Sequence, residues 1–295
     1  MTTKPPDPWI EEDQHDSLKL RYRIKKTLLE AESGFQRIAI AETHGFGRML
    51  FHDDIAMLSE RDERVYHEMI SHVPLFVNRG ARRVLVIGGG DGGTVREVVR
   101  HPRVDFCRLV EIDRAVVEAC REHIPQTAAA LSDPKVELTF EDGVAHVART
   151  TETYDLVIVD SSDPIGPAVG LFGSEFYSNV HRVLTDDGIV VSQGNSPFYE
   201  PEAQRKLIEV LAGLFRRVHL YNYSNLIYPG GLWSFSFASK ADLCPIGDFD
   251  PGAVGASGLD FHYYNSAVHR AAFVLPEFQA RRLGDLLTPF KKQPV

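Results

Sequence analysis

Alternation of apolar and polar residues marks the first part of the chain. It runs through residues 18–24, 35–41 and 46–51, with glycine-containing breaks between these stretches. A period of two is typical of strands with one buried face. Residues 1–16 are polar and rich in proline, so we expect a flexible lead-in there. The pattern predicts a small antiparallel β domain of three or more strands over residues 1–59.

The period changes from residue 60 onward. Apolar residues at helical spacing predict a helix over 60–77, which Pro74 ends or kinks. Beyond it, short apolar runs are each followed by an amphipathic segment, which predicts buried parallel strands covered by helices on both faces. We therefore expect a doubly wound, Rossmann-like α/β domain with a parallel sheet over residues 60–295, binding its ligands beyond the carboxyl ends of the strands. The predicted strands are 83–87, 106–110, 136–140, 155–159 and 188–192.

Composition and charge narrow the classes of partner. With 295 residues, 43% of them hydrophobic and 25% charged, the chain has room for two domains of an ordinary folded protein. Its formal net charge of -9 argues against a nucleic-acid partner, because such binding depends on clustered lysine and arginine. A cationic substrate suits the charge better, although mild acidity also serves solubility alone.

The sequence also bears on where the protein works. Cys107, Cys120 and Cys244 form no C-x-x-C pair, so we expect neither a disulfide framework nor a cysteine zinc site. The first residues carry no apolar core of a signal peptide, and no apolar stretch approaches the length of a membrane span. We therefore expect a cytoplasmic protein that contacts no membrane.

A glycine-rich loop follows the first predicted parallel strand. Gly88, Gly90 and Gly93 match G-x-G-x-x-G between a strand and a helix that begins near Thr94. Glycines at such positions let a ligand approach the backbone. This context predicts a nucleotide or nucleoside site, and the alternative is merely a tight turn.

Acidic residues end the next three predicted strands. Glu111 and Asp113 close the second strand, where an acid binds the ribose hydroxyls in both NAD and S-adenosylmethionine enzymes. Asp142 and Gly143 follow the third strand and suit an adenine amino group, and Asp160 ends the fourth. Each aspartate alone is equally well explained as a turn residue or a helix cap. Together the acids favour an adenosyl-sulfonium transferase of the methyltransferase type over a dehydrogenase.

Asp91, inside the glycine loop, distinguishes two possible donors. In a methyltransferase this loop lies close to the carboxylate of S-adenosylmethionine, which an aspartate would repel. Two unit charges about 4 Å apart interact by about 4 kcal/mol at an effective dielectric constant of about 20. Asp91 therefore favours decarboxylated S-adenosylmethionine, which lacks that carboxylate and has an ammonium for Asp91 to attract. The competing explanation is that Asp91 only caps the following helix.

Five stretches together resemble the spermidine synthase family of polyamine aminopropyltransferases, in the family's order and spacing from about residue 9 to about residue 278. The resemblance implies transfer of the aminopropyl group of decarboxylated S-adenosylmethionine to a diamine, putrescine first, giving spermidine and methylthioadenosine. It implies no cofactor, no metal and a homodimer or homotetramer. The stretches are R-D-E-R-V-Y-H-E-M at 61–69, G-G-G-D-G-G at 88–93, E-I-D at 111–113, D-S-S-D-P-I-G-P at 160–167 and Y-Y-N-S-A-V-H-R-A-A-F-V-L-P at 263–276.

The resemblance also implies roles for single residues. An acceptor amine with a pKa near that of lysine, about 10.4, arrives protonated near pH 7, so a base is required. By resemblance that base is Asp160, while Asp163 and His67 hold the polyamine and Tyr66 lies beside it. The other implied roles are Asp91 at the aminopropyl arm, Gln193 and Tyr228 in the far amine channel, Gln36 and Glu111 at the sugar, and Asp142, Gly143 and Pro167 at the adenine.

Three positions near the acceptor depart from the family pattern. Met57 replaces a glutamine before R-D-E, Ile227 lies in L-I-Y-P where many members have P-T-Y-P, and Val169 replaces an acid after G-P-A. The donor positions match the family. The departures therefore leave the acceptor open among putrescine, cadaverine, agmatine and a longer polyamine.

Other functions remain as alternatives. An S-adenosylmethionine-dependent amine N-methyltransferase would use the same scaffold, and Asp91 speaks against it. A non-catalytic polyamine-binding protein would explain the changed acceptor positions, and an NAD dehydrogenase would use the same glycine loop. His67 and His72 are five residues apart and do not match the zinc motif H-E-x-x-H, and Ser161 and Ser162 lack a G-x-S-x-G elbow.

Overall fold

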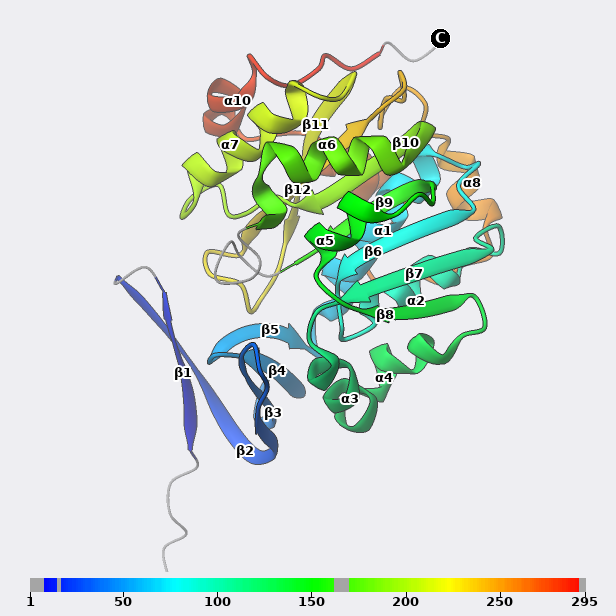
Figure 1. Ribbon diagram of the computed structural model, residues 1–295. Helices are drawn as coiled ribbons and strands as arrows, with labels where there is room; N and C mark the ends of the chain where they lie inside the picture. The colour runs from blue at the N-terminus through cyan, green and yellow to red at the C-terminus, as the bar shows by residue number, and fades with distance from the viewer. Residues whose placement is uncertain (1–7, 15–16, 162–169, 292–295) are drawn as a thin grey trace, which may run out of the picture.

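A five-stranded antiparallel sheet forms the first part of the chain in the computed structural model, which describes residues 8–14, 17–161 and 170–291. Its strands pair in chain order, and Figure 1 shows them grouped on one side of the molecule. The predicted N-terminal β architecture is confirmed, but the flexible lead-in expected over residues 1–16 is wrong for Trp9–Gln14, which form a strand paired with the next one. The strands are β1 (Trp9–Gln14), β2 (Leu18–Glu32), β3 (Arg37–Thr43), β4 (Arg48–His52) and β5 (Ile55–Ser59).

A mixed seven-stranded sheet, with the order β11-β12-β10-β9-β6-β7-β8, forms the rest of the fold. The five predicted strands pair in parallel, as expected. Two further strands, which the apolar pattern did not single out, extend the sheet in antiparallel fashion beyond β10. The strands are β6 (Arg83–Gly88), β7 (Phe106–Glu111), β8 (Val136–Phe140), β9 (Tyr154–Asp160), β10 (Leu184–Gln193), β11 (Arg217–Ser224) and β12 (Leu232–Ser239).

Helices cover both faces of this large sheet. None of the helices in the described parts of the chain is both long enough and apolar enough to cross a membrane. They are α1 (Glu63–Val77), α2 (Gly93–Val99), α3 (Arg114–His123), α4 (Pro125–Ala128), the 3-10 turn η1 (Ala129–Ser132), α5 (Gly143–Arg149), α6 (Ser174–Val183), α7 (Pro201–Ala212), α8 (Pro251–Ala256), α9 (Ser266–Ala272) and α10 (Glu277–Leu283).

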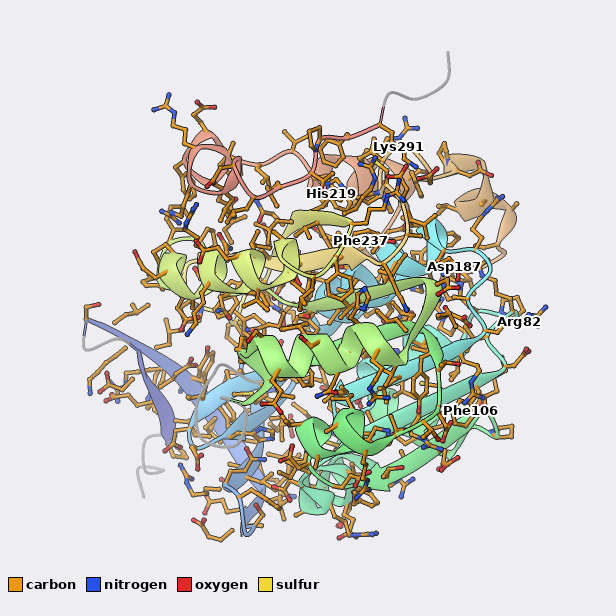
Figure 2. The ribbon with its side chains drawn as sticks, turned by 45° about the horizontal axis from the view of Figure 1, so that its top comes forward. Arg82, Phe106, Asp187, His219, Phe237 and Lys291 are labelled. Carbon is orange, nitrogen blue, oxygen red and sulfur yellow. The ribbon has the colours of Figure 1, made fainter. Side chains whose placement is uncertain are left out.

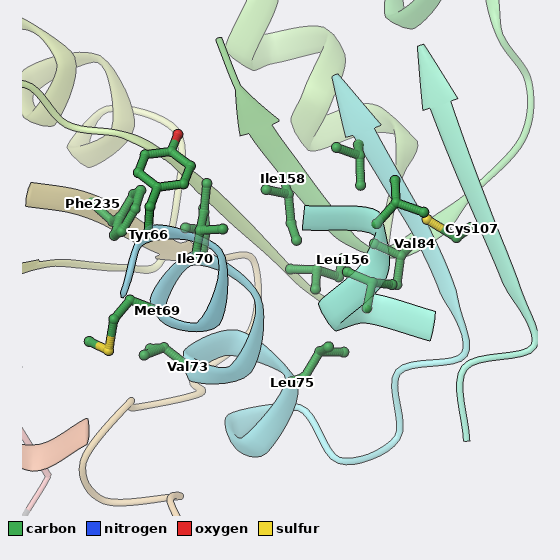
Figure 3. Close-up of a cluster of buried hydrophobic side chains, with 14 of the residues drawn as sticks. Tyr66, Met69, Ile70, Val73, Leu75, Val84, Cys107, Leu156, Ile158 and Phe235 are labelled. Atoms are coloured by element: carbon green, nitrogen blue, oxygen red, sulfur yellow. The ribbon is translucent and has the colours of Figure 1, made fainter. Parts of the chain in front are cut away.

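The strands of the large sheet supply two apolar cores. Val84 and Val86 of β6 face the core that contains α1, whereas Leu85 and Ile87 face the core that contains α6 and α7. Figure 3 shows the first core, in which side chains of α1 approach the strands of the sheet. Burial on both faces explains why these strands read as continuous apolar runs in the sequence.

Helix α1 begins at Glu63 and runs through Pro74 to Val77, so Pro74 does not end it. A proline inside a helix costs about 3 kcal/mol, because it removes a hydrogen bond and its ring clashes with the preceding turn. Every residue from Tyr66 to Val77 is buried. Packing against the sheet therefore outweighs the cost of the proline.

The carboxyl ends of β6 and β7 point toward the small sheet (Figure 1). Figure 2 shows Arg82 and Phe106, which lie at the opposite ends of these strands, on the side of the molecule away from the small sheet. The edge where ligands bind in such folds thus faces the N-terminal domain.

Glu68 joins α1 to the C-terminal segment. Its fully buried carboxylate accepts hydrogen bonds from the backbone N–H groups of His262, Tyr263 and Tyr264, each at 2.8 Å. Three donors on one buried carboxylate satisfy a charge that would otherwise be costly to bury. The C-terminal segment is therefore fastened to the helix that borders the cavity described below.

The substitution Glu68→Gln tests this attachment. An amide has one acceptor oxygen where the carboxylate has two, and its NH₂ group would face backbone donors. We expect the free energy of unfolding to fall by about 2 to 4 kcal/mol, measured by chemical denaturation. The control is Glu118→Gln, an exposed position on α3, where the change should be small. Equal effects of the two substitutions would contradict the attachment.

Candidate active site

A cavity of about 290 Å³ lies between the carboxyl edge of the large sheet and the small sheet. Every predicted site residue within the described ranges lines it. Asp163 and Pro167, together with the departing position Val169, lie outside the described residues. The predicted residues that line the cavity are Gln36, Tyr66, His67, Gly88, Gly90, Asp91, Glu111, Asp142, Gly143, Asp160, Gln193 and Tyr228.

The glycine loop is compact because other side chains occupy the space a Cβ would need. Gly89 has φ +70°, and a Cβ there would lie 2.6 Å from Oδ2 of Asp160. A Cβ at Gly93 would lie 2.1 Å from Cε1 of His67. The glycines therefore let the backbone lie against the side chains of Asp160 and His67. The motif alone predicted only that a ligand could approach this backbone.

Asp160, at the end of β9, is held by two hydroxyl donors. The Tyr66 hydroxyl donates to Oδ1 at 2.7 Å, and the Thr94 hydroxyl donates to Oδ2 at 2.6 Å. Burial raises the pKa of Tyr66 well above its ordinary value, and the charge of Asp160 adds to this effect. Tyr66 therefore keeps its proton. Both oxygens of Asp160 are thereby fixed in direction at the wall of the cavity.

Aromatic rings hold Tyr66 in place. Its ring meets those of Phe235, Tyr223 and Tyr228 edge to face, at centroid distances of 5.0, 5.7 and 6.1 Å. Figure 3 shows Tyr66 beside Phe235, with the hydroxyl turned away from the apolar cluster. Such contacts contribute about 0.5 to 1.5 kcal/mol each beyond burial. The orientation of the Tyr66 hydroxyl is therefore set by packing as well as by Asp160.

His67 and Asp91 form a second charged group beside Asp160. Nε2 of His67 lies 3.4 Å from Oδ1 of Asp91, and Nδ1 lies 2.6 Å from Oε2 of Glu63. Burial alone lowers the pKa of His67, but Asp91 and Glu63 outweigh burial and raise it to about 9. Burial and the nearby Asp160 raise the pKa of Asp91 to about 6, against the opposing effect of His67. At neutral pH the two groups form an ion pair.

Asp91 also accepts a hydrogen bond from the backbone N–H of Gly93 at 2.8 Å. This N–H belongs to the first residue of α2, although the N-cap residue itself is Gly92, and Asp91 also lines the cavity. One ring nitrogen of His67 and one carboxylate oxygen each of Asp91 and Asp160 lie within 4.8 Å of one another. Two carboxylates and one imidazole at this spacing suit a positively charged or proton-bearing group.

Acids at the ends of β7 and β8 form the other end of the cavity. Glu111 accepts backbone hydrogen bonds from Gly90 and Asp113, and burial raises its pKa to about 7. Asp142 caps α5 by accepting from the N–H of Val144. Asp142 therefore caps a helix and also lines the cavity.

Asp113 connects this end of the cavity to the small sheet. It accepts hydrogen bonds from the Ser33 hydroxyl at 2.7 Å and from Nε2 of Gln36 at 3.0 Å, and it caps α3. Gln36, predicted at the sugar of the nucleoside, is therefore oriented by an acid from the other domain. The geometry of the site therefore depends on how the two sheets are placed relative to each other.

The departing residues Met57 and Ile227 line the cavity next to Tyr228. The Tyr228 hydroxyl donates to the backbone carbonyl of Met57 at 2.9 Å. Two buried acids that the sequence reasoning did not single out also line the cavity, Glu12 and Asp62. Asp62 belongs to the R-D-E stretch, which is the only signal that pointed toward it.

Three further residues near Asp160 and His67 were not predicted from the sequence. Thr94 was noted only as the start of a helix, although it binds Asp160. Glu63 and Arg96 form a two-pronged ion pair, with both distances 2.8 Å, behind His67. Their partners come from separate elements, so only the folded chain reveals these contacts.

The sequence and the fold are similar to those of known polyamine enzymes. Residues 63–248 match the family model of the spermine/spermidine synthase domain, and residues 8–60 match that of the spermidine synthase tetramerisation domain. The chain is 45% identical to the polyamine aminopropyltransferase of Moorella thermoacetica over 92% of this chain and 94% of that protein. It is 43% identical to that of Desulforudis audaxviator over 93% and 98%. A spermidine synthase solved in complex with the transition-state analogue AdoDATO has a similar fold, with a TM-score of 0.92, 36% identity and coverage of 94% of this chain and 95% of that one.

The substitution Gly89→Ala tests the compactness of the glycine loop. A methyl group there meets the Asp160 carboxylate. The left-handed backbone conformation also costs alanine about 1 to 2 kcal/mol of conformational free energy that glycine avoids. We expect thermal or chemical unfolding to show a loss of about 1 to 3 kcal/mol. Gly255→Ala is the control, because a Cβ at Gly255 meets nothing within 4 Å. An unchanged stability of Gly89→Ala would show that the loop relaxes without strain.

Proposed function

The chain belongs to the spermine/spermidine synthase family and is an aminopropyltransferase, and from this premise we propose that it converts putrescine to spermidine. The donor is decarboxylated S-adenosylmethionine, the second product is methylthioadenosine, and no further cofactor takes part. The observation that carries the proposal is the grouping of Asp91, His67 and Asp160, with ligand atoms within 4.8 Å of one another beside the glycine loop. Such a grouping favours a donor arm and an acceptor that are both amines.

The donor nucleoside occupies the end of the cavity formed by β7 and β8. In this proposal Glu111 and Gln36 bind the ribose, and Asp142 and Gly143 bind the adenine, with Pro167 at its edge. The aminopropyl ammonium lies against Asp91, where the carboxylate of S-adenosylmethionine would be repelled. This arrangement supports decarboxylated S-adenosylmethionine over a methyl donor.

Asp160 is the proposed proton acceptor. A proton on the acceptor nitrogen first passes to Asp160, which frees the lone pair of the nitrogen. The nitrogen then attacks the aminopropyl carbon next to the sulfonium, and the carbon–sulfur bond breaks with its electron pair passing to sulfur. The hydroxyls of Tyr66 and Thr94 direct the two carboxylate oxygens, and holding both reactants in line supplies much of the rate.

Putrescine lies along the amine end of the cavity. Met57 and Ile227 offer apolar walls for its methylene groups, and Gln193 and Tyr228 lie along the same channel. His67 and Asp163 are the proposed partners of the amine. In this proposal the chain assembles as a homo-oligomer through residues 8–60, and the match of these residues to the tetramerisation domain supports this.

A donor-by-acceptor assay tests the function. Decarboxylated S-adenosylmethionine and S-adenosylmethionine are each incubated with putrescine, cadaverine, agmatine and spermidine, and products are identified by mass. Addition of a three-carbon amine to putrescine, from the decarboxylated donor alone, supports the proposal. Preferred transfer to another amine would overturn putrescine as acceptor, and methyl transfer from the intact donor would overturn the role of Asp91.

The substitution Asp160→Asn tests the proton acceptor. It keeps the size of the side chain but removes its basicity, so we expect turnover to fall about 10²- to 10⁴-fold with little change in nucleoside affinity. The control is Asp260→Asn at an exposed position. Near-normal turnover of Asp160→Asn would remove Asp160 from this role.

Nucleoside affinity should depend on pH through Glu111. Its pKa is raised by burial to about 7, and the ionised form accepts hydrogen bonds from ribose hydroxyls. We expect the affinity for methylthioadenosine to fall below about pH 7, by at most about tenfold per pH unit, when measured by calorimetry. Glu111→Gln should bind more weakly above that pH and lose the dependence. A wild-type affinity that stays flat through this range would contradict the role of Glu111.

A further inference from the structure

His67 has a carboxylate at each ring nitrogen. Nδ1 faces Glu63 at 2.6 Å, and Nε2 faces Asp91 at 3.4 Å. A carboxylate accepts hydrogen bonds and cannot donate them, so both ring nitrogens are matched only when both carry protons. The geometry alone therefore favours the imidazolium form of His67 in the ligand-free chain.

The charged groups around His67 come from four elements. Glu63 precedes it by one turn on α1, Asp91 lies in the glycine loop, Arg96 of α2 holds Glu63, and Asp160 ends β9. Tyr66 lies edge to face against the imidazole at 5.4 Å, and its hydroxyl donates a hydrogen bond to Asp160. Arg96 offsets part of the charge of Glu63, so Asp91 first and Glu63 second balance the positive charge of His67.

In the proposed function, the cation bound beside Asp91 is the ammonium of the donor. The imidazolium of His67 already lies beside Asp91, so the two cations compete for one carboxylate. We propose that His67 holds the place of the donor's ammonium in the empty site, and that binding of decarboxylated S-adenosylmethionine releases the Nε2 proton of His67 to solvent. This inference rests on the proposed function.

The exchange keeps the number of positive charges beside Asp91 constant, while the donor's sulfonium adds one positive charge to the site as a whole. One positive charge enters on the donor's ammonium and one leaves as the proton, while Asp91 stays ionised throughout. Neutral His67 then offers a lone pair at Nε2, which can accept a hydrogen bond from an amine. His67 thus changes from a cation that neutralises Asp91 into an acceptor that helps to hold substrate.

Calorimetry in buffers of different ionisation enthalpy counts the protons released. At about pH 8 His67 is still mostly protonated, with its pKa raised to about 9 by Asp91 and Glu63 against the opposing effect of burial, whereas Glu111 and Asp91 are mostly ionised. We expect decarboxylated S-adenosylmethionine to release most of one proton. Methylthioadenosine, which has neither the ammonium nor the sulfonium, should release almost none.

Two variants separate His67 from other sources of protons. His67→Gln should bind the donor with almost no release. Glu63→Gln keeps the imidazole but removes the carboxylate behind it, so release should fall in part because the empty site holds less of the proton. His219→Gln is the control, because His219 is buried among Phe237 (Figure 2) and Phe290, outside the residues that line the cavity, and release should stay at the wild-type value.

The outcomes distinguish this inference from the proposed function. A wild-type chain that binds the donor and transfers aminopropyl groups, but releases no proton, would overturn the exchange alone. Equal release by wild type and His67→Gln would also overturn it, since the proton would come from another group. A chain that does not bind the donor would remove both the proposed function and the exchange.

Discussion

The concentration of carboxylates at one edge of a sheet is the constraint on which the site depends. Glu111, Asp113, Asp142 and Asp160 follow neighbouring parallel strands, and Asp91 lies in the loop among them. A buried carboxylate is costly unless donors satisfy it, and like charges raise the cost further. Hydroxyls, backbone N–H groups and one imidazole supply these donors. The charge that remains suits substrates that arrive as cations.

Meeting this constraint joins elements distant in the sequence. Asp113 takes its donors from the small sheet, and the Tyr228 hydroxyl reaches back to the carbonyl of Met57. The backbone N–H of Leu226 donates to Asp62 at 2.7 Å. These contacts join the small sheet and the residues that follow it to loops of the large sheet. The cavity is therefore a property of the whole fold and cannot be assigned to either sheet alone.

Much of this could be predicted from the sequence, because periodicity and strand-end positions are local signals. The five parallel strands and the acids at their ends were predicted, and Glu111, Asp142 and Asp160 among these acids line one cavity. The antiparallel strands β11 and β12 were missed because their sequences, R-V-H-L-Y-N-Y-S and L-W-S-F-S-F-A-S, alternate apolar and polar residues and lack the continuous apolar run that marks the parallel strands. Thr94 and Arg96 were missed for a different reason. Their partners, Asp160 and Glu63, belong to other elements, and tertiary packing alone decides such pairs.

The close approach of Gly93 to His67 has an evolutionary consequence. A Cβ at position 93 would lie 2.1 Å from Cε1 of the imidazole, so any side chain there clashes while histidine stays at position 67. The order of change is thereby constrained: position 67 must first accept a smaller or differently directed side chain before position 93 can vary. Lineages that keep the histidine should keep the glycine, and the two positions should vary together among relatives.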